Sequence, residues 1–226
     1  MDSVYDDSEC ISKEVAEGRH REVVGGMWEE IGRLQFEFVK NAGLLPEHFL
    51  LDVGCGSLRG GVHFVRYLDH GHYCGIDINK SLLDAGYSRE IAPVSLLAGK
   101  LPPQNLACIG DFDVSCFGRS FDFAIAQSLF SHLSFNRIRL CLEKIAKAVI
   151  PGGKFFATYF NIPENNPYSV PFEHSPGGIV TFGHQDPYHY KIADFHHAIR
   201  NMPWQLDNAG DWNHPRAQWI LTFTRI

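Results

Sequence analysis

The chain has 226 residues, 45% of them hydrophobic and 20% charged, which is the composition of a globular protein with length enough for one domain and a sizeable core. Its formal net charge of −6 argues against a general DNA- or RNA-binding surface, because such a surface needs Lys and Arg to neutralise phosphates, and we therefore expect no nucleic-acid partner. The sequence shows no signal peptide, no apolar run near the roughly 18 residues of a spanning helix and no C-x-x-C pair, which predicts a cytoplasmic protein without membrane contact.

The N-terminal region predicts a polar arm followed by one amphipathic helix. Residues 1–20 are polar, and the sequence does not fix their position. Apolar side chains then recur at helical spacing until about Asn41. These side chains are Trp28, Ile31, Leu34 and Phe38. The Gly25–Gly26 pair before them suits either a hinge or a loop folded over a ligand. We therefore separate an arm and helical cover, 1–44, from the main domain, 45–226.

A glycine-rich turn after the first predicted strand is the feature around which the chain is organised. The strand covers 49–53 and carries Asp52, and it is followed by Gly54 and Gly56, where the backbone can turn sharply and approach a ligand. A dinucleotide fingerprint, G-x-G-x-x-G, would need glycine where Arg59 stands. An NAD-dependent oxidoreductase is therefore the less favoured interpretation, but it stays open.

The second predicted strand, 73–77, ends in Asp77, about 20 residues beyond the glycine turn. A carboxylate at this point can accept two hydrogen bonds from a ribose diol. The string from Asp52 to Gly56, followed by Gly-Ile-Asp at 75–77, resembles the paired cofactor motifs of class I S-adenosylmethionine-dependent methyltransferases. The wider sequence, from about residue 25 to the end, is similar to bacterial small-molecule members of that family.

The resemblance implies a Rossmann-like α/β fold in which a seven-stranded, doubly wound and mostly parallel sheet ends on an antiparallel strand pair. It also implies S-adenosylmethionine as the cofactor. After the third predicted strand, 106–110, Asp111 would face the adenine amino group and Phe112 would lie against the ring, with Asp113 as the alternative acid. The implied cofactor-binding residues are Asp52, Gly54, Gly56, Ser57, Arg59, Asp77, Ile78, Asp111, Phe112, Gln127 and Trp28.

The fourth predicted strand, 121–126, opens onto the edge where this family places its methyl acceptor. Metal-dependent catechol-type members carry an acid there, whereas this chain has Ala126 and Gln127, so we expect no metal ion. The Asp-Pro-Pro-Tyr signature of base-methylating members is also absent from this edge. His132 follows the strand, and because histidine titrates in a suitable range it is the first candidate for a general base.

The region 161–190 is long, irregular and rich in proline and aromatic residues. A loop of this length in a compact domain is typical of a cover or a binding loop, so we predict a substrate lid. Its His174 and His184 are candidate substrate-binding residues.

Two final strands are predicted over 204–207 and 217–224, and the loop between them should open at the ligand-binding edge of the sheet. Trp212 and Asn213 in this loop are candidate substrate-binding residues, and His214 is the second candidate base.

We therefore predict a metal-independent enzyme that moves a methyl group from S-adenosylmethionine to O, N or C of a small-molecule acceptor. The alternative from another class is a fold member that binds the cofactor without methyl transfer, as a regulator or a scaffold for another reaction. The acceptor, the need for a base and the oligomeric state, with a homodimer as one option, cannot be read from the residues.

Overall fold

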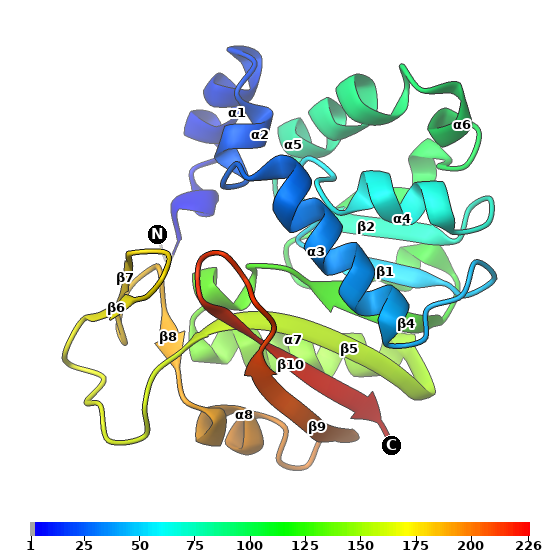
Figure 1. The fold of residues 1–226 in the computed structure, drawn as a ribbon. Coiled ribbons are helices and arrows are strands. Elements are labelled where there is room, and N and C mark those ends of the chain that lie inside the picture. The colour runs from blue at the N-terminus through cyan, green and yellow to red at the C-terminus, as the bar shows by residue number, and fades with distance from the viewer. Residues whose placement is uncertain (1–2) are drawn as a thin grey trace.

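A central β-sheet with helices on both faces forms the body of the protein in the computed structural model, which describes residues 3–226 (Figure 1). Residues 1 and 2 of the predicted arm lie outside the described residues. The strands are β1 (Leu50–Val53), β2 (Tyr73–Asp77), β3 (Leu106–Cys108), β4 (Phe121–Ala126), β5 (Val149–Asn161), β6 (Phe172–His174), β7 (Ile179–Thr181), β8 (His189–Tyr190), β9 (Trp204–Asp211) and β10 (Gln218–Arg225). The α-helices are α1 (Ser8–Ala16), α2 (His20–Val23), α3 (Trp28–Asn41), α4 (Gly61–Tyr67), α5 (Lys80–Ala85), α6 (Ser95–Ala98), α7 (Phe135–Ala148) and α8 (Ile192–Ala198).

The strands of the main sheet follow the order β3-β2-β1-β4-β5-β10-β9. The pairs from β3 to β5 are parallel, and β10 lies antiparallel between β5 and β9. This order confirms the predicted doubly wound, mostly parallel sheet that ends on an antiparallel pair. The short strand β8, which the sequence did not predict, pairs with the end of β5 and brings the sheet to eight strands.

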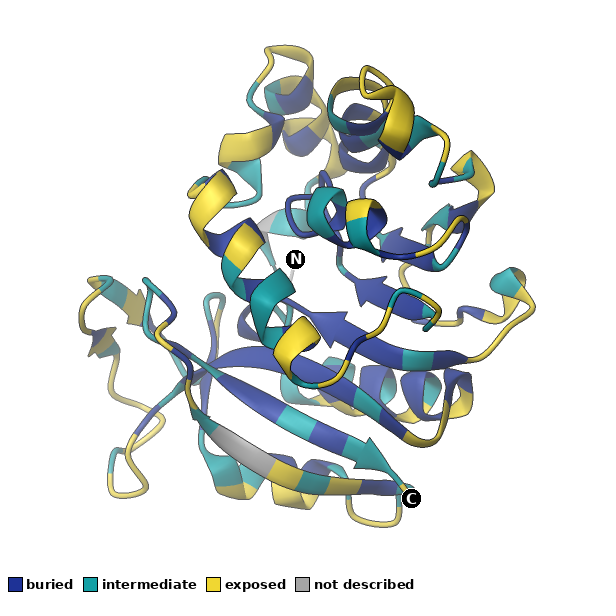
Figure 2. Cartoon of the chain, turned by 45° about the vertical axis from the view of Figure 1, so that its right-hand side comes forward, coloured by how far each residue is buried: buried dark blue, intermediate teal, exposed yellow. Residues whose placement is uncertain are grey.

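Each face of the sheet has its own hydrophobic core. Ile138 of α7 and Phe195 of α8 pack on one face, while Val39 of α3 and Phe64 of α4 pack on the other. Figure 2 shows the central strands buried along most of their length, with the exposed residues on the outer sides of the helices. Parallel strands are apolar on both faces, so helices must cover both. None of the helices in the described part of the chain is long and apolar enough to cross a membrane.

Strand β5 begins at Val149 and includes the Pro151-Gly152-Gly153 turn, which stays in the sheet as an irregularity. Val149 pairs with Phe121 and Lys154 pairs with Phe123, so the residues between them bulge from the strand. Gly153 permits this, since an added Cβ would lie 2.8 Å from the carbonyl oxygen of Asp122.

The N-terminal arm lies across α5, on the side of the sheet that carries α3 and α4 (Figure 1). Four apolar side chains from α1 and α5 form a small core of their own: Ile11, Val15, Leu82 and Ala85. In α2, Nε2 of His20 lies 2.7 Å from the carboxylate of Glu90, and Arg21 donates two hydrogen bonds to the same carboxylate. These contacts fix the arm, which sequence reasoning left unplaced.

The predicted lid, 161–190, contains more regular structure than its composition indicated. Strands β6 and β7 form a small antiparallel hairpin apart from the main sheet, and β8 returns to the main sheet beside β5. The polypeptide between β5 and α8 therefore lies beside this end of the sheet and has regular secondary structure in β6, β7 and β8 (Figure 1).

Candidate functional site

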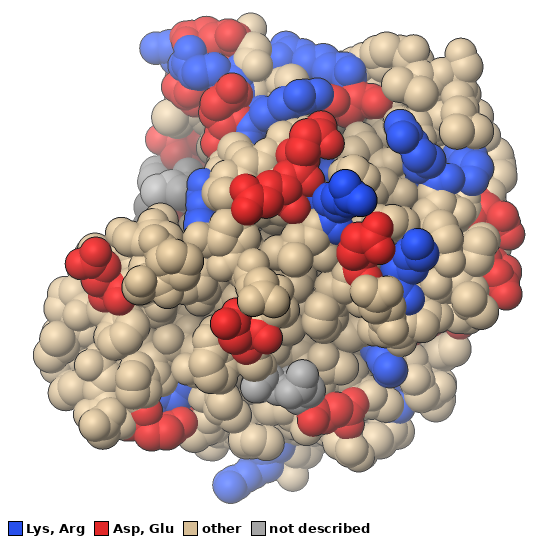
Figure 3. All heavy atoms as spheres, in the orientation of Figure 1, with Lys and Arg blue, Asp and Glu red and all other residues tan. Residues whose placement is uncertain are grey.

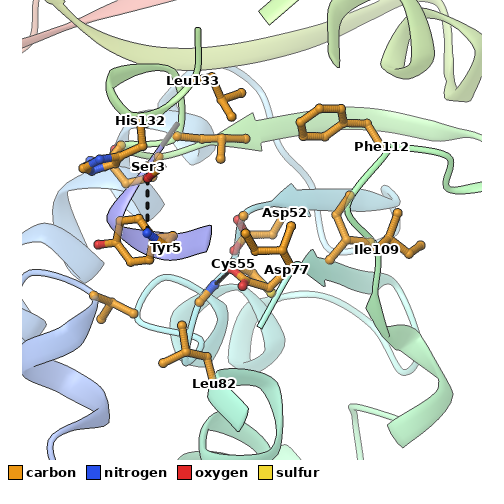
Figure 4. Close-up of a pocket in the computed structure, with 18 of the residues that line it drawn as sticks. Ser3, Tyr5, Asp52, Cys55, Asp77, Leu82, Ile109, Phe112, His132 and Leu133 are labelled. Atoms are coloured by element: carbon orange, nitrogen blue, oxygen red, sulfur yellow. Dashed lines mark hydrogen bonds between the residues drawn. The ribbon is translucent and has the colours of Figure 1, made fainter. Parts of the chain in front are cut away.

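A cavity of about 230 Å³ opens at the carboxyl ends of β1, β2 and β4, which is where open α/β sheets bind ligands. Its walls are the glycine turn after β1, the end of β2, and the segments that follow β3 and β4. The N-terminal arm contributes Ser3, Tyr5 and Asp6 to the lining (Figure 4). The predicted cover, 1–44, and the predicted main domain, 45–226, therefore both line this cavity.

The turn after β1 uses glycine for two physical reasons. Gly54 and Gly56 have φ angles of +74° and +54°, in the left-handed region that other residues adopt at a cost. An added Cβ on Gly56 would also lie 2.6 Å from the Val24 side chain of the cover. The predicted close approach is therefore present, and the backbone of the turn lines the cavity.

Asp77 fixes this turn and also lines the cavity. Its carboxylate accepts hydrogen bonds from the backbone N–H groups of Gly56, at 2.9 Å, and Asn79, at 2.8 Å. Burial raises the pKa of Asp77, while these hydrogen bonds oppose the rise. Ile78 lines the cavity beside it, so both residues lie where the sequence placed them.

Asp52 lies deeper in the same wall and is 3% exposed. The hydroxyl of Tyr73 donates a hydrogen bond of 2.8 Å to its carboxylate. Burial, together with the charge of Asp77, raises the pKa of Asp52 to about 7, although the Tyr73 bond and Arg59 favour the ionised form. A bound cation would therefore stabilise the charged carboxylate.

The wall after β3 is apolar, and only part of its prediction holds. Phe112 and Ile109 line the cavity. Asp111 is exposed, does not line the cavity, and accepts a hydrogen bond from the Asp113 N–H. The alternative acid, Asp113, forms an ion pair of 3.2 Å with Lys144. The aromatic residue therefore lines the cavity, but neither acid does, because Asp111 bonds within its own turn and Asp113 pairs with Lys144.

The roof over the cavity is the N-terminal arm. The Tyr5 hydroxyl donates to the Val23 carbonyl oxygen at 3.1 Å, and the Asn79 amide donates to the Tyr5 carbonyl oxygen at 3.1 Å. The Tyr5 ring meets the His132 ring edge-on, with centroids 4.8 Å apart. The sequence predicted a cover over 1–44 but not that Tyr5 lines the cavity, and the signal for Tyr5 was a lone aromatic ring within a polar, acidic stretch.

Two predicted cofactor residues, Trp28 and Ser57, do not line the cavity. The Ser57 hydroxyl donates to the His20 carbonyl oxygen at 2.9 Å, and the Trp28 ring receives the Arg21 guanidinium at 4.7 Å. Both residues attach the cover to the domain, so their assignment to the cofactor is corrected to a supporting role.

Arg59 lines the cavity and holds the loop that contains Gly25 and Gly26. One guanidinium nitrogen donates to the carbonyl oxygens of Val24 and Gly26, each at 2.9 Å. The Arg216 side chain donates to the Gly25 carbonyl oxygen. Burial lowers the pKa of Arg59 to about 10, with the nearby Arg216 adding to the effect. The segment 24–26, which contains the glycine pair, is thus held against the cavity wall by hydrogen bonds from Arg59 and Arg216.

The predicted base His214 lies behind the cavity wall and is 2% exposed. Its Nδ1 accepts a hydrogen bond from the Arg216 N–H at 3.1 Å, and its Nε2 lies 3.1 Å from the side-chain amide of Gln127, which does line the cavity. Burial, together with the charges of Arg59 and Arg216, lowers the pKa of His214 to about 3. Both ring nitrogens are occupied, so the assignment of His214 as a general base is corrected.

Its neighbours Trp212 and Asn213 are also outside the lining. The Trp212 ring is buried, donates to the Gln218 carbonyl oxygen at 3.0 Å and packs on Phe38, whereas Asn213 is exposed. Strand β9 extends to Asp211 and β10 begins at Gln218, so the connection between them is short. The Trp212 ring lies inward from this connection, against the core.

His132 lies in the cavity lining, at the short turn Phe130–His132 after β4. Its Nδ1 lies 2.6 Å from a carboxylate oxygen of Asp186, and Ser3 donates to the other oxygen at 2.8 Å. Among the described residues, Nε2 of His132 has no hydrogen-bond partner. Asp186, which sequence reasoning missed, therefore joins the region 161–190 to the cavity.

The two histidines of that region that were candidates for substrate binding, His174 and His184, are not at the cavity. His174 is buried beside the Thr181 hydroxyl, 2.9 Å away, and burial lowers its pKa to about 4. His184 contacts the Phe182 ring. These contacts of the two histidines lie within the segment that contains the β6–β7 hairpin, and neither residue lines the cavity that other candidate residues share. In the part of the chain that the structure describes, no group of three or more His, Cys, Asp or Glu side chains is arranged to hold a metal ion.

Comparisons with known proteins agree with this geometry. Residues 51–155 match a family model described as a methyltransferase domain. The fold is similar to that of magnesium protoporphyrin IX methyltransferase from Synechocystis, solved with bound S-adenosylmethionine, with a TM-score of 0.66, 14% identity and 100% of both chains covered. The segment 51–155 therefore matches a methyltransferase domain, within a fold that solved methyltransferases share. A second similar structure is an amino pentose methyltransferase from Micromonospora echinaspora, with a TM-score of 0.62, 15% identity, and 93% and 95% of the two chains covered.

One comparison corrects the expectation that no nucleic acid is involved with this methyltransferase. The chain is 34% identical over 132 residues to the 18S rRNA (guanine(1575)-N(7))-methyltransferase of Saccharomyces cerevisiae. The match covers 54% of this chain and 43% of that relative, which is therefore much longer than the matched part. Net charge alone was an inadequate basis for excluding RNA, because a base can be methylated by a domain without a general phosphate-binding surface.

Proposed function

We propose that this chain transfers a methyl group from S-adenosylmethionine to a nucleophilic atom of a small-molecule acceptor. The observation that carries the proposal is the cavity in which the glycine turn, Asp52 and Asp77 face an enclosed space beneath the Tyr5 roof. The Tyr5 ring and the neighbouring residues of the N-terminal arm line the cavity, and this cover leaves less room for a polymer than for a small acceptor. On the face drawn in Figure 3, Lys and Arg side chains are interspersed with Asp and Glu.

The residues of the cavity suit each part of this cofactor. Asp77 would accept hydrogen bonds from the ribose hydroxyls, and Ile109 and Phe112 would lie against the adenine ring. Gly56 lets the Val24 side chain of the cover approach the turn closely, because an added Cβ would lie 2.6 Å from it. The cofactor supplies a methyl group on a sulfonium, which is already a good leaving group, so the protein mainly aligns the reactants and excludes water.

His132 is our candidate for the group that takes up an acceptor proton. Asp186 accepts the Nδ1–H of the ring, which leaves Nε2 as the nitrogen with a free lone pair. An acceptor hydroxyl or ammonium must lose a proton as its oxygen or nitrogen becomes methylated, and Nε2 can accept that proton and later release it to water. Asp186 would stabilise the imidazolium that forms.

A second candidate function, methylation of a guanine in RNA, is favoured by the yeast relative. Guanine N7 already has a lone pair, so this acceptor needs no general base. It would have to enter the cavity as an unstacked base.

The experiment that tests these functions uses S-adenosylmethionine labelled with tritium in the methyl group. The chain is incubated with a small-molecule cell extract in one reaction and with total RNA in another, and a Gly56→Val variant serves as the control. We expect label in the small-molecule fraction that the control does not produce. Label in RNA alone would favour the second function. S-adenosylhomocysteine binding without label in either fraction would contradict both functions and favour a cofactor-binding regulator or scaffold.

A further inference from the structure

The carboxylate of Asp186 joins three segments that are far apart in the sequence. Its Oδ1 lies 2.6 Å from Nδ1 of His132, in the turn after β4, and its Oδ2 accepts a hydrogen bond of 2.8 Å from the Ser3 hydroxyl of the N-terminal arm. The Asp186 side chain is 7% exposed, so both bonds are largely shielded from water, which strengthens them. The arm, the segment 161–190 and the turn after β4 are therefore connected through this one group.

The loop that carries Asp186 is also attached to the turn after β4 by its own backbone. The Tyr188 N–H donates to the Ser131 carbonyl oxygen at 2.7 Å. This bond places Asp186 beside His132 and does not involve the arm. It does not determine how the carboxylate is rotated, because the terminal torsion of an aspartate side chain has a broad range. The orientation of the carboxylate needs a further contact.

The arm supplies that contact from one short element. Ser3 is the N-cap of the 3₁₀ helix Val4–Asp6. Its hydroxyl accepts the Tyr5 N–H at 3.2 Å and donates to Oδ2 of Asp186, which directs Oδ1 at His132. The Tyr5 ring meets the His132 ring edge-on, with centroids 4.8 Å apart, and restricts its rotation. Figure 4 shows Ser3 and Tyr5 on the same side of the cavity as His132.

The residues that orient this pair also cover the cavity. Ser3 and Tyr5 belong to its lining, so a ligand that enters beneath them must displace the helix Val4–Asp6. When this helix leaves, the Asp186 carboxylate loses the Ser3 bond and the His132 ring loses its aromatic neighbour at the same time. The arrangement in which Nδ1–H is bound to Asp186 and the Nε2 lone pair is available thus belongs to the covered cavity.

We propose that Ser3 and Tyr5 are positioning residues for His132, so that covering the cavity also completes the base. The inference rests on the proposed function, in which Nε2 takes the proton of the acceptor O–H or N–H and the bonding pair stays on the acceptor atom. Proton transfer is then confined to the state from which water is excluded. An acceptor that enters the open cavity meets a base that is not yet oriented, and it keeps its proton until the arm closes.

The first test follows the Nδ1 proton of His132 by NMR, in a chain labelled with ¹⁵N at histidine and saturated with S-adenosylhomocysteine. The wild-type ring should carry its proton on Nδ1 and exchange it slowly with water. Ser3→Ala should raise the exchange rate about 10- to 100-fold, the range expected for the loss of a hydrogen bond to a charged group. Ser8→Ala, the same change at an exposed site of the arm, should leave the rate unchanged.

The second test measures tritium transfer from labelled S-adenosylmethionine to the small-molecule extract, at cofactor concentrations that saturate each protein. Ser3→Ala should lower this saturated rate about 10-fold, because fewer molecules hold an oriented base. Ser3→Thr, which keeps the hydroxyl, should restore both the saturated rate and the slow exchange of the Nδ1 proton. Ser8→Ala should again match the wild-type chain.

Three results would overturn the positioning role. They are a wild-type His132 ring with its proton on Nε2, an exchange rate in Ser3→Ala equal to that of the wild-type chain, and a Ser3→Ala variant that needs more cofactor for half-maximal transfer but reaches the wild-type saturated rate. The last result would make Ser3 a part of the roof alone. A wild-type chain that binds S-adenosylhomocysteine and transfers no label would instead contradict the proposed function, and the exchange rates would still decide the role of Ser3.

Discussion

Removing the Tyr5 side chain should open the roof of the cavity without unfolding the arm. Two interactions would be lost, the hydrogen bond from the Tyr5 hydroxyl to Val23 and the edge-on contact with the His132 ring. A neutral hydrogen bond contributes about 1 kcal/mol and an aromatic pair about 1 kcal/mol, so Tyr5→Ala should shift the closed–open equilibrium of the roof by about 2 kcal/mol, or about 30-fold.

The measurement is the rate at which bound tritiated S-adenosylhomocysteine exchanges with an excess of unlabelled ligand. We expect Tyr5→Ala to raise the dissociation rate about 30-fold and Tyr5→Phe, which loses only the hydroxyl, to raise it about 5-fold. The melting temperature should change little, because Ile11 and Val15 still anchor α1. Dissociation from Tyr5→Ala at the wild-type rate would refute the role of the arm as a roof.

Three further predictions follow from the walls of the cavity. Asp77→Ala should weaken S-adenosylhomocysteine binding by about 2–3 kcal/mol in calorimetry, because it removes charged hydrogen bonds; unchanged affinity would reject the ribose assignment. The pKa of Asp52 is raised from 3.8 to about 7, so the folded state holds this proton more tightly than the unfolded state, and the free energy of unfolding falls as pH rises from about 4 to about 7. Chemical denaturation should show this fall, on the order of 4 kcal/mol at most, in the wild-type chain and not in Asp52→Asn. Parallel pH profiles of the two proteins would contradict the prediction. Once an acceptor is known, a chelator should leave turnover intact, and activity restored by magnesium would refute metal independence.

The sequence predicted the sheet and the glycine turn because both depend on local patterns. The apolar run before Gly54 and the acid at Asp77 specify a buried strand, a turn and a ligand-facing carboxylate over short stretches of chain. Those residues line the cavity, and their roles toward the cofactor stay predictions. The order of strands followed from a resemblance carried by the same motifs.

The errors at the site arose where a side chain's direction depends on distant contacts. Nothing in the residues around His214 indicates that Gln127 and Arg216 occupy both of its ring nitrogens. Likewise, the pairing of His132 with Asp186 joins residues 54 positions apart. The role of Tyr5 as part of the roof depends on how α1 packs against α5, which composition does not encode.

The most direct test of the account is a calorimetric titration of the purified chain with S-adenosylhomocysteine and, separately, with NAD. We expect one S-adenosylhomocysteine to bind per chain, and we expect no binding of NAD. The heat signal should be lost in Gly56→Val, because the added side chain would clash with Val24 and disturb the glycine turn. NAD binding without S-adenosylhomocysteine binding would contradict the central claim that this cavity is a methyl-donor site.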